Sequence, residues 1–107
     1  MEPLRIREYV KANGVNPYRM WLQTLDLKVR ARVQARITRF ESGNLGDRKF
    51  VGRGVWEARF TFGSGYRVYF GLDGQEIVLL LLGGDKRSQT KDIANAQLYW
   101  ADYCERG

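Results

Sequence analysis

Histidine is absent from this 107-residue chain, and cysteine occurs only once, as Cys104. Because a disulfide needs two thiols, none can form within the chain, which fits a reducing compartment. The usual zinc ligand sets cannot be assembled from one thiol and no imidazole. We therefore expect no metal site of that kind and no cofactor, although a magnesium site made of carboxylates alone stays open.

Long hydrophobic runs are also missing. The longest one, from Ile77 to Leu82, is far too short to span a bilayer. The first residues lack the apolar segment of a secretory signal. These absences predict a cytoplasmic protein with no membrane partner, and the length predicts a single domain over residues 1–107 with one core.

Positive charge is abundant and unevenly placed. The formal net charge is +6; residues 1–54 carry twelve Lys or Arg and five Asp or Glu, whereas residues 55–107 carry six and seven. A concentrated positive half favours a polyanionic partner such as nucleic acid. The alternative is a solubilising surface with no specific partner.

Hydrophobic periodicity and turn residues predict seven elements. Asn16-Pro17 and Asp26 are typical helix starts, because Asn and Asp cap helices and proline fits the first turn. In order, we expect a strand over 4–10, a helix from Pro17, a helix from Asp26 to about Gly43, strands on both sides of the loop 63–65, a two-residue turn at Asp73-Gly74, a strand over 76–82 and a helix over 88–105. This order predicts an α+β fold with its helices on one face of a twisted antiparallel sheet.

The two strands around the loop 63–65 separate apolar from polar side chains. Alternate residues point to opposite faces of a strand, so one face of this hairpin belongs to the core. The other face carries Glu57, Arg59, Arg67 and Tyr69. Since an antiparallel sheet often leaves one face in water, we expect these four side chains on an exposed platform suited to a phosphodiester backbone. A set of plain cross-strand ion pairs is the competing interpretation.

Two further basic segments lie outside this hairpin. The second helix carries a stripe at four-residue spacing, made of Lys28, Arg32, Arg36 and Arg39, and a glycine-rich loop over 43–54 holds Arg48, Lys49 and Arg53. Both are candidates for contact with nucleic acid or the ribosome. For the stripe, the alternative is a solvated helix face whose long side chains cover the core.

Several of these segments together resemble a known family. Gly54 to Arg59, Gly65 to Phe70 and the segment from Leu82 through Asp92-Ile93 to Ala96 are similar to the phage-derived, HigB-like branch of the RelE/ParE toxin superfamily. The resemblance covers most of the chain. It implies a RelE-like fold, in which a helical hairpin and a C-terminal helix pack on a mainly antiparallel four-stranded sheet.

The resemblance also implies a function and partners. Such proteins are toxins of type II toxin–antitoxin systems, neutralised in this branch by a helix-turn-helix antitoxin, and many cut mRNA on the ribosome. It implies a metal-independent endoribonuclease that inhibits translation, with Arg67 as the main catalytic arginine and Arg59 and Lys86 as further cations. Glu57 is a candidate base because it faces the same side as Arg59, and here the chain departs from RelE, which has a basic residue near that position. Arg87, Lys91 and Tyr69 are expected to contact RNA.

Two other functions remain open from the sequence. ParE-like members share the fold but poison DNA gyrase. The segment from Ser88 to Asp92 contains no tyrosine, whereas RelE-like enzymes use one there. That departure leaves proton transfer open among Glu57, Tyr69, Lys86, Lys91 and Asp92, and it keeps a noncatalytic RNA- or ribosome-binding domain as the third interpretation.

Overall fold

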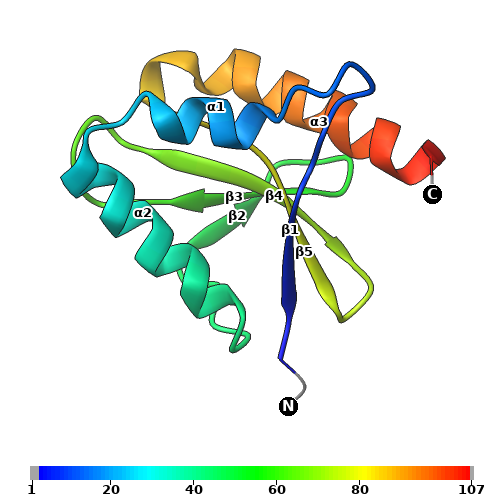
Figure 1. The fold of residues 1–107 in the computed structure, drawn as a ribbon, viewed down its shortest axis with the longest axis horizontal. Helices are drawn as coiled ribbons and strands as arrows, with labels where there is room; N and C mark the ends of the chain where they lie inside the picture. Colours follow the sequence, from blue (N-terminus) through cyan, green and yellow to red (C-terminus); the bar gives the residue numbers. More distant parts are fainter. Residues whose placement is uncertain (1–2, 107) are drawn as a thin grey trace.

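A computed structural model describes residues 3–106, in which a central sheet lies between helices (Figure 1). The strands are β1 (Arg5–Glu8), β2 (Arg48–Phe50), β3 (Val55–Arg59), β4 (Arg67–Asp73) and β5 (Ile77–Gly84). The helices are α1 (Pro17–Gln23), α2 (Leu27–Phe40) and α3 (Gln89–Arg106), and the short 3-10 helix η1 (Lys86–Ser88) leads into α3. The predicted α+β class is confirmed.

The sheet has five strands in the order β1-β5-β4-β3-β2, so the predicted four-stranded sheet is wrong. β1 runs parallel to β5, and the other neighbours are antiparallel. The extra strand is β2, which comes from the segment predicted to be a basic loop. All three of its residues are exposed, so it shows no buried alternation that would mark a strand. A short, charged strand of this kind is typical of a sheet edge.

The helix starts agree with the sequence prediction. The Asn16 side chain accepts a hydrogen bond from the backbone N–H of Arg19, and Pro17 is the first residue of α1. Asp26 caps α2 in the same way by accepting from Val29. The predicted two-residue turn between β4 and β5 is wrong, because Asp73 pairs with Ile77 and three residues connect them.

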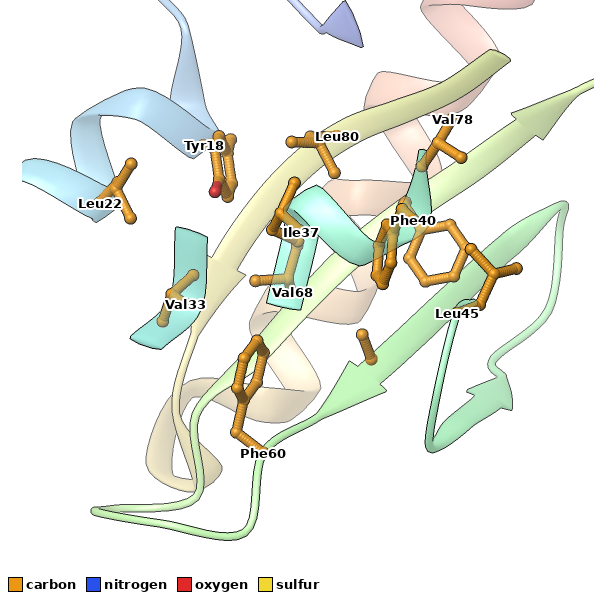
Figure 2. Close-up of a cluster of buried hydrophobic side chains, with 12 residues drawn as sticks. Tyr18, Leu22, Val33, Ile37, Phe40, Leu45, Phe60, Val68, Val78 and Leu80 are labelled. Carbon is orange, nitrogen blue, oxygen red and sulfur yellow. The ribbon is translucent and has the colours of Figure 1, made fainter. Parts of the chain in front are cut away.

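One core fills the space between the sheet and the first two helices (Figure 2). α1 contributes Tyr18 and Leu22, while α2 contributes its apolar stripe of Val33, Ile37 and Phe40. From the hairpin, Ala58, Phe60, Val68 and Phe70 face the same core, as the alternation predicted. The two helices run in opposite directions and splay apart from their short connection (Figure 1).

A second core covers the opposite face, beneath α3. Ala96 of α3 packs there with Val55, Tyr69, Leu79 and Leu81, all of them buried. The prediction that all helices lie on one face, with the other face exposed, is therefore wrong. Within residues 3–106, none of the helices combines the length and the apolar character that a membrane crossing requires.

Glycine in β4 allows α3 to lie close to the sheet. A Cβ added to Gly71 would overlap the indole ring of Trp100, which therefore rests directly on the strand backbone. Gly71 has ordinary extended backbone, so the requirement is for space rather than for an unusual φ. At its start, α3 also reaches the polar residues of the sheet, where Gln89 donates to Glu57 of β3.

Candidate nucleic-acid interface

Three of the predicted catalytic cations lie at one end of the sheet. Arg67 opens β4, where it pairs with Arg59 of β3 and with Gly84 of β5. Lys86 follows β5, and its backbone N–H donates to the carbonyl of Ser64 in the β3–β4 loop at 3.3 Å. We call Arg59, Arg67 and Lys86 the basic corner.

The guanidinium of Arg67 and the base of the Lys86 side chain both lie close to Gly65. A Cβ added to Gly65 would lie 3.2 Å from Nη1 of Arg67 and 3.3 Å from Cβ of Lys86. Lys86 is exposed, and Arg59 is 44% exposed with Asp47 3.7 Å away. The corner thus combines two exposed cations with an arginine whose side chain is only 12% exposed.

Glu57 lies behind Arg67 and is fully buried. Its Oε2 accepts hydrogen bonds from the Tyr69 hydroxyl at 3.1 Å and from Nε2 of Gln89 at 2.9 Å. Nε of Arg67 lies 3.5 Å from the same oxygen. We call Glu57, Arg67, Tyr69 and Gln89 the buried Glu57 cluster. Since a buried carboxylate needs a charge partner, Arg67 is tied to Glu57.

The predicted exposed platform is wrong for Glu57 and Tyr69, because α3 covers both. Burial raises the pKa of Tyr69 far above its usual range, and the charge of Glu57 raises it further. The phenol therefore stays protonated and serves as a hydrogen-bond donor. Neither side chain is exposed to a substrate in this arrangement, so their geometry suits positioning rather than proton transfer.

Two atoms of the Arg67 guanidinium have protein partners. Nη1 donates to the carbonyl of Gly65 at 2.7 Å, whereas Nε makes an ionic contact with Oε2 of Glu57 at 3.5 Å without a hydrogen bond. These two contacts already restrict the rotamers of Arg67 in the free protein. Less side-chain entropy is therefore lost when the residue binds an anion. The residue is therefore preorganised, with its partly exposed tip beside Lys86.

A second basic surface adjoins the corner along α2. A groove of about 380 Å³ is lined by Arg32 and Arg39 of α2, by Arg59 and by Phe62. The guanidinium of Arg32 lies 3.7 Å from the ring centre of Phe62, a cation–π contact. We call these residues the basic groove, and its charge suits a phosphate backbone.

Arg36 belongs to the predicted stripe but has a structural role. Its guanidinium donates to the backbone carbonyls of Leu45, Asp47 and Arg59, which holds the loop after α2 against the sheet. Burial lowers its pKa. The spacing along the helix did not distinguish Arg36 from its neighbours, because the carbonyls that it binds come from distant segments.

The other predicted contact residues are spread over several elements. Arg48 packs against Trp56 at the β2 edge, with 5.5 Å between its guanidinium and the ring centre. β3 and β4 separate that edge from β5. The remaining predicted contact residues are all exposed: Lys28 on α2, Lys49 in β2, Arg53 in the turn after it, Arg87 beside Asp85 and Lys91 on α3. Within residues 3–106, no group of three His, Cys, Asp or Glu side chains is arranged to hold a metal ion.

Sequence reasoning missed a hollow beside the basic corner. It has a volume of about 460 Å³ and lies between α1, the β3–β4 loop and the start of α3. Trp21 of α1 and Asp92, which the sequence offered as a candidate for proton transfer, both line it. The only signal in the sequence is Gly83-Gly84, whose bare backbone makes room for both side chains.

Comparison with known proteins identifies the family. The family model described as Phage derived protein Gp49-like (DUF891) matches residues 20–99, and the chain belongs to this family. A protein of Haemophilus influenzae strain Rd, described as uncharacterized, is 47% identical over 79 residues, which cover 73% of this chain and 80% of that protein. Membership of this family is consistent with a toxin of a toxin–antitoxin pair.

Proposed function

We propose that this protein is the toxin of a type II toxin–antitoxin pair and cuts mRNA on the ribosome without a metal ion. The observation that carries the proposal is the anchored Arg67, held by buried Glu57 and placed beside exposed Lys86. An arginine fixed in this way stabilises the extra negative charge that develops on phosphorus when the chain is cut. Membership of the Gp49-like family supports the toxin class.

The reaction requires three events at one phosphate. The 2′-oxygen loses its proton and attacks phosphorus, the phosphorane charge is stabilised, and the 5′-oxygen leaves with a proton. Arg67 and Arg59 stabilise the negative charge of the phosphorane. Among the residues considered for proton transfer, Lys86 combines exposure with a place near Arg67, so its ammonium donates the proton to the leaving 5′-oxygen, while the proton of the 2′-hydroxyl passes to water. Glu57, Tyr69 and Gln89 hold Arg67, and the ribosome aligns the RNA.

The basic groove supports an RNA path that leads into the corner. Arg59 belongs to both surfaces, so a backbone lying along α2 reaches the corner without a gap in positive charge. Cation density of this kind produces strong, salt-dependent binding to RNA. The second partner in this proposal is a helix-turn-helix antitoxin, which follows from the family resemblance alone.

A noncatalytic contact with RNA or the ribosome is the second candidate. The burial of Glu57 and Tyr69 favours it, because two of the candidates for proton transfer are then out of reach of RNA. In that case the same cations bind RNA and block translation without cutting. The gyrase-poisoning alternative gains no support from the anchored arginine.

The test uses purified protein, programmed ribosomes and end-labelled mRNA, with free mRNA and a gyrase supercoiling reaction run in parallel. We expect cuts in ribosome-bound mRNA, little cutting of free mRNA and normal supercoiling. Translation arrest with intact mRNA would instead establish the noncatalytic contact. Inhibited supercoiling with intact mRNA would contradict both RNA-directed functions and would indicate that the protein acts on DNA gyrase.

A further inference from the structure

The hollow beside the basic corner has the size and walls of a small-ligand site. Its volume of about 460 Å³ falls within the range of roughly 300–1,000 Å³ that is common for such sites. Its walls carry the aromatic rings of Trp21 and Tyr66, and its polar groups include Ser88, Asp85 and Asp92. We call it the Trp21–Asp92 pocket.

Two aromatic rings offer flat surfaces in the pocket. The indole of Trp21 lies directly on the backbone of Gly83, where a Cβ would overlap the ring. The centre of the Tyr66 ring lies 6.4 Å from that of Trp21, with 62° between the planes. Both side chains are only partly buried, so part of each ring remains available to stack on a planar ligand.

Asp92 supplies a buried acceptor. The residue is 8% exposed, and its Oδ2 accepts a hydrogen bond from the Ser88 hydroxyl at 2.5 Å. No donor among residues 3–106 reaches Oδ1, although the carboxylate lines the pocket. Oδ1 keeps contact with solvent, so it is free to accept a hydrogen bond. A ligand with N–H groups could donate to it in place of water.

We propose that the Trp21–Asp92 pocket binds one unpaired nucleobase of RNA, with guanine preferred and uracil disfavoured. The pocket's side chains are rich in acceptors, and guanine presents adjacent N1–H and N2–H donors that match one carboxylate. Uracil presents a single N–H between two carbonyl oxygens, which a carboxylate repels. Unpaired bases stacked on aromatic rings are the usual way in which proteins read RNA sequence.

The position of the pocket favours RNA over a basic side chain from a protein partner. Ser64 lines the pocket, and its backbone carbonyl accepts from the N–H of Lys86 in the basic corner. The neighbouring Gly65 touches Arg67, and Arg87 also lines the pocket. A nucleotide therefore meets acceptors at its base and cations at its phosphate. This inference rests on the proposed RNA target and adds a sequence preference to it.

The test measures mononucleotide binding to the whole protein and needs neither the ribosome nor cleavage. Guanosine, inosine and uridine 5′-monophosphates are titrated into ¹⁵N-labelled protein, and the signals of the Trp21 indole N–H, Gly83 and Gly84 are followed. We expect guanosine monophosphate to bind at least about tenfold more tightly than uridine monophosphate. Inosine lacks the 2-amino group and should also bind more weakly than guanosine.

Asp92→Asn should reduce the preference for guanosine over uridine to less than about threefold. Asp73→Asn is the matched control, because it removes one charge at the other end of β4 and should leave the preference unchanged. Equal binding of all three nucleotides, or shifts confined to other residues, would overturn the proposal. So would stronger binding of N-acetyl-arginine amide at the same residues, since that would identify a peptide pocket. If guanosine binds but ribosome-bound mRNA stays intact, the proposed cleavage fails while the pocket stands.

Discussion

Arg67 lies diagonally across from Glu57 on the neighbouring strand, with Nε of the arginine 3.5 Å from Oε2 of the glutamate. The strand register places Glu57 opposite Tyr69 and Arg67 opposite Arg59. The side chains of Arg67 and Glu57 therefore meet along a diagonal between the two strands. Glu57 is fully buried, while the arginine is 12% exposed. One charge thus holds the other at the edge of the basic corner.

Removing one member of this pair should cost more stability than replacing both. Arg67→Ala leaves a buried carboxylate without its cation, so we expect the free energy of unfolding to fall by about 3–5 kcal/mol. The double variant Glu57→Gln/Arg67→Met keeps the side-chain volume and the hydrogen bonds from Tyr69 and Gln89, and should lose far less. Urea denaturation of both checks this. Arg59→Ala, in an exposed pair, should change stability by less than about 1 kcal/mol. Equal losses for the single and double variants would contradict the account.

Tyr69→Phe separates the structural role of the phenol from a catalytic one. The hydroxyl donates to buried Glu57, so its loss should lower the free energy of unfolding by about 1.5–3 kcal/mol. Because the ring is fully buried, we expect mRNA cutting to remain close to wild type at temperatures where the variant is folded. Thermal unfolding and the ribosome assay are measured on the same sample. A folded variant that no longer cuts would give the phenol a direct part in the chemistry.

Gly71→Ala should separate α3 from the sheet. The added methyl group would overlap the Trp100 ring, and overpacking of this kind typically costs about 1–3 kcal/mol. Adding Trp100→Leu makes space again, so the double variant should be less damaged than the sum of the two single changes. Thermal unfolding of the three variants tests this. Simple additivity would show that the two residues do not constrain each other.

The raised pKa of the Asp92 carboxyl predicts that the stability of the protein depends on pH. Burial raises the pKa of this carboxyl in the folded state, and the charge of Asp85 adds to the effect, while Ser88 and Lys91 oppose it. A raised pKa stabilises the fold while the group is protonated, and this contribution is lost as the pH rises through the folded pKa. The stability of Asp92→Asn minus that of the wild type should therefore increase from about pH 3 to about pH 7. A constant difference would place the carboxylate in water.

The hydrophobic pattern predicted the sheet face toward α1 and α2 correctly, as well as both helix caps. The prediction was wrong for the other face, because the alternation of apolar and polar residues predicted Glu57 and Tyr69 to be exposed, whereas both are buried. Their burial depends on α3, which begins 20 residues after Tyr69 and 32 residues after Glu57, and whose Gln89 donates to Glu57. Local periodicity contains no information about such a contact. The strand β2 was missed for a related reason, since its pairing with β3, rather than its own composition, makes it a strand.

The candidate site was predictable in part. The sequence and the family resemblance brought Arg59, Arg67 and Lys86 together, and the structure places them at one end of the sheet. The division of roles was not predictable, because Glu57 and Arg36 look like exposed charged residues until their distant partners are known. Whether the basic corner cuts RNA remains the central prediction.

The most direct test is the ribosome assay with the Glu57→Gln/Arg67→Met variant, whose fold is checked first by its unfolding curve. Arg5→Ala serves as the matched control, because it removes an exposed arginine from the far strand of the sheet. The account predicts that the control cuts ribosome-bound mRNA like the wild type, whereas the double variant leaves it intact while still folded. Undiminished cutting by the folded double variant would contradict the assignment of Arg67 as the residue that stabilises the reacting phosphate.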